Sequence, residues 1–314
     1  MTILLYGLDT YRSRQKLNEI IENYKKVRKS GLNLRFFDGK ELDFPDDASW
    51  NKWGPATKLS RDDWRRQNVD TFIARVYQSV KAAKPWVKFG VSPFGIWRPG
   101  YPPQIKGLDA YANLYADSRK WLQNGWVDYF TPQLYWRIDP PEQSFPVLLK
   151  WWATQNLKHR HLWPGMNTGG GRGDWKADEI TRQIEITRKQ PAVTGHVHWN
   201  MKSLIRNRAL ADSLAKGLYA QPALVPAIRG KLPGRPHLSV SAGDKPDSVR
   251  VNWSPAAGGT VRFWVLQTKR GVSWTSKVTS DTSQILDGPA PEVISVTAID
   301  HTGNASPPVV LARQ

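Results

Sequence analysis

Cysteine is absent from the 314 residues, which excludes disulfides, thiolate metal sites and a cysteine nucleophile. No apolar run approaches the ~20 residues that a membrane-spanning helix requires, so we expect no membrane span. The opening residues, MTILLYGLDTYRSRQK, do not have the pattern of a secretory signal peptide, because polar residues appear early and no cleavage site follows. A hydrophobic content of 40% is sufficient for a globular core.

Acidic residues are scarce relative to basic ones, since 27 Asp and Glu stand against 45 Lys and Arg for a formal charge of +18. Such a charge is compatible with binding to nucleic acid or an anionic surface. The basic residues are spread along predicted helical faces, however, and no zinc-finger, helix-turn-helix or RNA-binding signature is present. We therefore expect no nucleic-acid partner. A basic nucleic-acid-binding protein is kept as the third interpretation, after the two given at the end of this section.

Tryptophan is abundant, with 16 residues, 13 of them before residue 221. A Trp side chain provides a large flat apolar surface and one N–H donor. A core alone rarely needs so many, so this content indicates a surface that binds ligands through aromatic rings.

Residues 60–220 alternate between strand and helix patterns. Ser60 to Asp63 has the pattern of a capping box and predicts a helix that ends before Pro85. Further helices are predicted at 108–124, 144–158, 175–189 and 201–217, and strands at 87–92, 127–136, 160–166 and 195–200. Repeated strand–helix units of this length predict a parallel sheet, and the strands are apolar on both faces, as buried parallel strands are.

The expected fold is α/β, of the (β/α)8 TIM-barrel type. A doubly wound open sheet is the alternative, but no glycine-rich nucleotide loop follows its first strand. A complete barrel needs eight strands and about 250 residues. The chain has four predicted strands after residue 60 and one more at 31–37, so the barrel is expected to be incomplete at its N-terminus.

The pattern changes after residue 222. Residues 223–236 belong to a stretch rich in Pro and Gly that predicts a stiff linker. Residues 237–314 contain short alternating strands separated by turns, which predicts a small all-β sandwich. The expected domains are thus a partial barrel over 1–222, the linker, and the sandwich.

Three segments carry a resemblance to a known family: LSRDDWRRQNVDTFIARVYQSVKAAKPWVKFGVSPFGIWRPG, YADSRKWLQNGWVDYFTPQLYW and GHVHWNMKSL. They resemble the glycosyl-hydrolase-like family 10, bacterial barrel proteins described as family-10 glycosylhydrolases. The C-terminal part resembles a fibronectin type III domain, with Trp253 at the position of the early-strand Trp and an aliphatic residue near Ile294 in place of the corner Tyr. The first resemblance implies O-glycosyl hydrolase activity on bacterial cell-envelope glycans, such as peptidoglycan, and export to the envelope.

Loops that follow barrel strands converge at one mouth, where the active site of such a barrel lies. Sugars present apolar faces flanked by hydroxyl groups, so aromatic and hydrogen-bonding side chains are expected there. The candidate substrate-binding residues are Ser92, Trp97, Arg98, Gln133, Tyr135, Trp136, Trp163, Asn167, Trp175, His198 and Trp199. In the loop GVSPFGIWRPG, Trp97 is expected to stack on a sugar and Arg98 to orient hydroxyls or an acidic substituent.

Glycoside hydrolysis ordinarily requires two carboxylates across the scissile bond. The candidates are Asp38, Asp139 and Glu142, with Asp174 in a later loop, whereas Asp128 begins its strand and is expected to be structural. The resemblance implies an acidic pair at the end of the fourth strand, but the corresponding segment, GLNLRFFD, lacks it. We therefore expect a truncated or altered enzyme, whose exposed barrel edge favours self-association.

No cofactor and no metal are expected. Two pairs of histidines, at 159/161 and 196/198, share strand faces, but a metal site needs a third ligand. The leading interpretation is a glycoside hydrolase acting on a polysaccharide without cofactor. The alternative is a non-catalytic carbohydrate-binding protein that keeps the aromatic groove.

Overall fold

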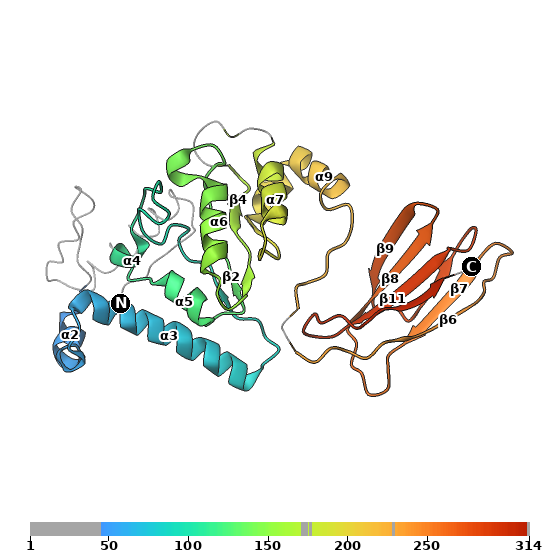
Figure 1. Cartoon of the computed structure of the whole chain (residues 1–314), viewed down its shortest axis with the longest axis horizontal. Coiled ribbons are helices and arrows are strands. Elements are labelled where there is room, and N and C mark those ends of the chain that lie inside the picture. The colour runs from blue at the N-terminus through green and yellow to red at the C-terminus, as the bar shows by residue number, and fades with distance from the viewer. Residues whose placement is uncertain (1–44, 171–174, 176–177, 228–229, 313–314) are drawn as a thin grey trace, which may run out of the picture. The chain divides into compact units, whose positions relative to one another are not determined.

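The computed structural model describes residues 45–170, 175, 178–227 and 230–312 (Figure 1). The expected strand at 31–37 and the candidate acids Asp38 and Asp174 lie outside these residues.

The α/β part has short parallel strands: β1 (Gly90–Val91), β2 (Tyr129–Phe130), β3 (His161–Leu162), β4 (Gly165–Asn167) and β5 (Val197–Trp199). One sheet has the order β1-β2-β3, and β4 pairs with β5. Isolated parallel bridges join Phe94 to Gln133 and Gln133 to Gly165, and therefore continue the first two strand paths beyond β1 and β2. Consecutive strand paths are thus spatial neighbours, as the repeated strand–helix pattern predicted. A closed barrel stays a prediction.

Helices connect these strands: α3 (Arg61–Ala83), α4 (Ala110–Asn113), α5 (Ser118–Asn124), α6 (Phe145–Gln155), α7 (Glu179–Lys189), α8 (Met201–Arg206) and α9 (Arg208–Lys216). Before them lie α2 (Asp47–Trp53) and the 3-10 turn η1 (Pro55–Thr57), and the 3-10 turn η2 (Pro141–Gln143) precedes α6. The capping box is confirmed, because Ser60 Oγ accepts the Asp63 N–H at 3.1 Å.

Two predicted helices were wrong in their continuity. The helix expected at 108–124 is divided into α4 and α5, because Tyr115 has a left-handed φ of 51° and Asp117 caps a new helix by accepting the Lys120 N–H. The helix expected at 201–217 is likewise divided, because the Asn207 side chain accepts the Leu210 N–H and starts α9. Local capping by short polar side chains therefore overrides the apolar periodicity.

The helices pack on one face of the parallel strands, as the ribbons of α6 and α7 beside β2 and β4 show (Figure 1). Phe130, Leu162 and Met166 point to this face and are fully buried with Trp152 of α6 and Ile184 of α7. The Trp152 indole N–H donates to the Gly95 carbonyl at 2.8 Å, which anchors the loop after β1 on the helical layer.

The C-terminal part is a β-sandwich with a core of its own. Its strands are β6 (His237–Ala242), β7 (Val249–Ser254), β8 (Phe263–Arg270), β9 (Ser273–Thr279), β10 (Ser283–Leu286), β11 (Val293–Ile299) and β12 (Val309–Ala312). They form antiparallel sheets in the orders β10-β7-β6 and β12-β11-β8-β9. Trp253 is buried in this core and donates to the Asp281 carbonyl at 3.0 Å, while Ile294 packs among the same residues. The sandwich was expected, and only the short strand β10 was missed.

Candidate active site

The parallel strands have two different faces. The Gly165–Asn167 segment pairs with Val197–Trp199 in register, so Met166 lies opposite His198 and points into the helical core. Residues one position away point to the other face. This second face carries half-buried and exposed aromatic rings, and we call it the aromatic face: Tyr129, Tyr135, His161, Trp163 and Trp199.

Glycines allow these rings to lie flat against the strands. A Cβ on Gly90 would come within 2.3–2.4 Å of the Tyr129 ring, and one on Gly165 would come within 3.3 Å of Tyr135. Both tyrosines therefore cover positions where the strand has no side chain. Tyr129 stacks on Trp163 with ring centroids 4.6 Å apart, and Trp163 donates to Thr194 Oγ1 at 2.9 Å.

Tyr135 and Trp199 form the part of the aromatic face that lies at the carboxyl ends of the strands. Their rings are stacked, with centroids 6.2 Å apart and an interplanar angle of 29°, and Trp199 is 44% exposed. Burial raises the pKa of Tyr135 to about 12, which keeps its phenol neutral. We call this pair the aromatic platform.

Polar side chains accompany the platform at the strand ends. Gln133 donates through Nε2 to the exposed Ser92 carbonyl at 2.9 Å, which joins the loops after β1 and β2. Asn167 ends β4 directly opposite Trp199. The predicted residues Ser92, Gln133 and Asn167 therefore lie at the same ends of neighbouring strands as the platform.

The structure places Trp97 elsewhere. It is only 8% exposed, lies among Tyr101, Tyr111 and Trp151, and donates to Asp117 Oδ1 at 3.0 Å. Its ring is a core component, so the expectation that it stacks on a sugar is not supported.

Arg98, the neighbour of Trp97 in the loop after β1, is held within the protein. Its Nε is 3.2 Å from Asp109 Oδ2, and its guanidinium lies 4.6 Å from the centre of the Tyr111 ring. The half-exposed guanidinium therefore braces the loop after β1.

Three other predicted contacts are also outside the aromatic face. Trp136 and Trp175 pack against the helical core. His198 points to the core face, where its ring nitrogens contact Thr168 Oγ1 and the Tyr219 hydroxyl, each at 2.7 Å. Because successive residues of a strand point to opposite faces, His198 faces the core whereas Trp199 lies on the aromatic face.

The candidate carboxylates have different surroundings. Glu142 is exposed and bonds the exposed Lys106, and Asp139 is also exposed, in the preceding loop. Asp128 lies at the opposite strand end, where its Oδ2 is 2.5 Å from Lys81 Nζ and accepts the Phe89 N–H at 2.8 Å. The prediction that Asp128 is structural agrees with these contacts.

One buried carboxylate was missed. Glu179, at the start of α7, is 1% exposed and accepts hydrogen bonds from the Ile138 N–H at 2.8 Å and from Gln183 Nε2 at 2.9 Å. Gln183 also donates to the Trp136 carbonyl at 3.0 Å. Glu179 therefore fixes the loop after β2, which begins at the platform. The one sequence feature that could have indicated Glu179 is its position as an acidic residue at the start of a helix.

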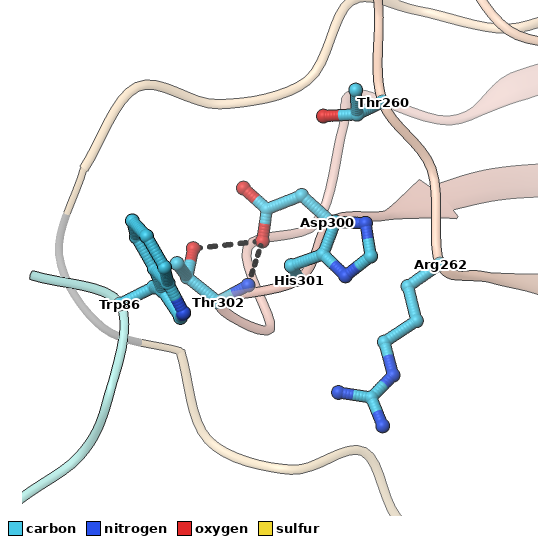
Figure 2. A pocket seen from close by; sticks show the side chains of 6 residues that line it. All are labelled: Trp86, Thr260, Arg262, Asp300, His301 and Thr302. Carbon is cyan, nitrogen blue, oxygen red and sulfur yellow. Dashed lines mark hydrogen bonds between the residues drawn. The ribbon is translucent and has the colours of Figure 1, made fainter. Parts of the chain in front are cut away.

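A pocket is lined by Trp86, Thr260, Arg262, Asp300, His301 and Thr302 (Figure 2). The Asp300 carboxylate accepts the N–H and hydroxyl of Thr302, both at 2.8 Å, and the Asn304 N–H at 2.9 Å. Burial by itself would raise the pKa of Asp300, but these hydrogen bonds outweigh it and lower the pKa. The carboxylate closes its own turn and is not a catalytic candidate.

In the described part of the chain, no group of three or more His, Asp or Glu side chains is arranged to hold a metal ion. Across the same residues, no helix has both the length and the hydropathy of a membrane span.

Comparison with known proteins identifies the family of this chain. Residues 37–169 match the family described as glycosyl hydrolase-like 10. The chain is 37% identical to glycosyl hydrolase YngK of Bacillus subtilis (strain 168) in an alignment of 222 residues that covers 67% of this chain and 42% of that protein. It is 42% identical to glycosyl hydrolase DigH of Escherichia coli (strain K12) in an alignment of 167 residues that covers 48% of this chain and 38% of that protein.

A solved fibronectin type-III domain of human fibronectin type III domain containing protein 3 also aligns, at 16% identity and a TM-score of 0.22, covering 28% of this chain and 91% of that one.

The resemblance to the glycosyl-hydrolase-like family 10 is therefore confirmed, and the chain belongs to this family. It spans about two fifths of the length of the curated relatives that it matches.

Proposed function

We propose that the chain binds a bacterial cell-envelope glycan, peptidoglycan or a related polysaccharide, on the aromatic face and takes part in hydrolysing it. The observation that carries this proposal is the platform of Tyr135 and Trp199 at the strand ends. A stacked, partly exposed aromatic pair offers apolar area to the CH face of a sugar ring. Gln133 and Asn167 supply amide donors and acceptors beside it, as a pocket for a polyhydroxylated ligand requires.

Hydrolysis would follow from two carboxylates acting as acid and base or nucleophile. Asp139 is the candidate on the loop that begins at the platform, with Glu142 and Asp38 as the other candidates. The Glu142 carboxylate accepts from the Lys106 ammonium.

The test compares binding of purified glycan strands by three proteins. Trp199→Ala removes half of the platform and is expected to weaken binding about tenfold or more, consistent with one stacked aromatic residue. Trp274→Ala is the matched control, because Trp274 is 51% exposed on strand β9 of the sandwich. Equal losses in both variants, or no binding by the unaltered chain, would contradict the proposal.

Carbohydrate binding without catalysis is the second candidate function, favoured by the ion pair that occupies Glu142. Turnover of the same glycan separates the two: a rate that Asp139→Asn abolishes supports hydrolysis, and binding without any turnover supports the second candidate. Binding to DNA that falls steeply with salt, without glycan binding, would instead support a nucleic-acid interaction.

A further inference from the structure

A continuous chain of hydrogen bonds runs along the core side of strand β5. Thr168 Oγ1 contacts His198 Nδ1 at 2.7 Å, and His198 Nε2 contacts the Tyr219 hydroxyl at 2.7 Å. The same hydroxyl bonds His196 Nε2. His196 and His198 are two residues apart on an extended segment, so both imidazoles reach the same face and converge on one phenol.

The side chains in this hydrogen-bond network can all be paired while they are uncharged. Burial, together with His198 and Arg188, lowers the pKa of His196 to about 4, and burial lowers the pKa of His198. Burial raises the pKa of Tyr219 to about 12. A phenol has one proton to donate and can accept others, so at most one imidazole accepts from it and at least one donates to it through Nε2. When one donates and the other accepts, in either direction, both Nε2 atoms and the hydroxyl are paired.

Strand β5 is held on one side by backbone hydrogen bonds, among them Val197 N–H to the Pro164 carbonyl at 3.0 Å. In the described sheet it pairs with β4 alone, and only over Val197–Trp199. Val197 and Trp199 are both more than one third exposed, so they add little buried apolar area. The hydrogen bonds made by His196 and His198 therefore help to hold this strand in position.

The hydrogen-bond network also lies directly beside the platform residues in the sequence. Trp199 follows His198 directly, and the Trp199 carbonyl accepts the Thr168 N–H at 2.9 Å. Thr168, which contacts His198 from the other side, follows Asn167 of the candidate site. A shift of His198 would consequently move Trp199 relative to Tyr135 and Asn167.

We propose that Tyr219 is a positioning residue for the glycan platform, which holds Trp199 over Tyr135 through its bonds to His196 and His198. Tyr219 itself lies on the core side of the strand, whereas the ligand would contact the other side. This inference rests on the proposed glycan binding at Trp199.

The first experiment measures glycan binding by Tyr219→Phe, which keeps the ring stacked on His196 and removes only the hydroxyl. We expect affinity to fall about tenfold, since two imidazole nitrogens of half-buried side chains lose their partner and the strand can shift. Tyr77→Phe, which removes a tyrosine hydroxyl from α3, is the matched control and is expected to bind like the unaltered chain. Affinity of Tyr219→Phe equal to that of the control would overturn the inference.

A double-mutant cycle with Trp199→Ala distinguishes positioning from a general loss of stability. If Tyr219 acts through Trp199, Tyr219→Phe has no further effect on binding once Trp199 is alanine. Additive losses would show that Tyr219 acts on the whole fold and would overturn the inference. If Trp199→Ala binds as well as the unaltered chain, the proposed function fails instead, so the two failures are distinguishable.

Two substitutions of His198 give an independent test should Tyr219→Phe not fold. His198→Gln places an amide near the position of Nε2 and keeps the link to Tyr219, whereas His198→Asn places it near Nδ1 and keeps only the link to Thr168. We expect His198→Gln to retain more affinity than His198→Asn. The reverse order would assign the positioning to Thr168 and overturn the role of Tyr219.

Discussion

Lowering the pH is expected to destabilise the α/β part through His196. Its imidazole titrates at about 4 in the folded chain, chiefly because it is buried, and near 6.5 when unfolded. Between these values the unfolded chain binds more protons, so the free energy of unfolding falls as the pH falls. The groups that face His196 are His198 on its own strand, Arg188 of α7 and the Tyr219 hydroxyl, and none of them is an anion at these pH values.

The size of the effect follows from the two pKa values. Above pH 6.5 the contribution is negligible, at pH 5 it reaches about 2 kcal/mol, and below pH 4 it is complete at roughly 3 kcal/mol. His198, whose pKa is also lowered by burial, adds a loss of the same sign. Carboxylates titrate in the same range, so the comparison must be made against a variant in which only His196 is changed.

The assay compares urea unfolding of the unaltered chain and His196→Gln at pH 7.5 and pH 5.0. Glutamine places an amide near Nε2 but takes up no proton, so the loss of stability between the two pH values should be about 2 kcal/mol smaller in the variant. An NMR titration that follows the imidazole resonance missing from His196→Gln gives the pKa directly. A resonance that titrates near 6.5, or equal pH-dependent losses in both proteins, would refute the reasoning.

Two further substitutions test the packing. Gly90→Ala would place a methyl group 2.3–2.4 Å from the Tyr129 ring and should lower the unfolding free energy by about 1–3 kcal/mol, with partial recovery in the double variant with Tyr129→Ala; no loss would show that the ring moves freely. Lys120→Met leaves the Asp70 carboxylate, whose side chain is 6% exposed, without the ammonium that donates to it at 2.8 Å, and should cost about 3 kcal/mol by urea unfolding. Asp70→Asn leaves the Lys120 side chain 46% exposed to water and should cost less; a larger loss than in Lys120→Met would contradict that account.

The general architecture was predictable from the sequence because it depends on repeated patterns. Strand–helix alternation indicated neighbouring parallel strands, short alternating segments indicated the antiparallel strands of the C-terminal part, and Ser60 marked the start of α3. The helix at 108–124 could not be predicted as two helices, because its division depends on the left-handed backbone of Tyr115.

The candidate site was predictable in part. Residue types at strand ends identified Tyr135, Trp199, Gln133 and Asn167 together, since all of them end neighbouring parallel strands. Which face a side chain occupies depends on strand register, which is set by contacts distant in sequence. Trp97 was assigned to the ligand although it serves the core.

His198 was assigned to the ligand for the same reason, although it faces Tyr219. Tyr219 and Glu179 were missed, because neither belongs to a strand-end loop.

The contacts of Tyr219 with His196 and His198 determine where this part of the chain can be shortened without loss of the platform. Tyr219 lies beyond Lys216, the last residue of α9, and just before the Pro-rich linker. A chain shortened at Lys216 would retain every described strand and helix of the α/β part, yet it would lose the phenol on which His196 and His198 converge. The smallest piece that preserves the geometry of the platform therefore extends past the last helix to residue 219.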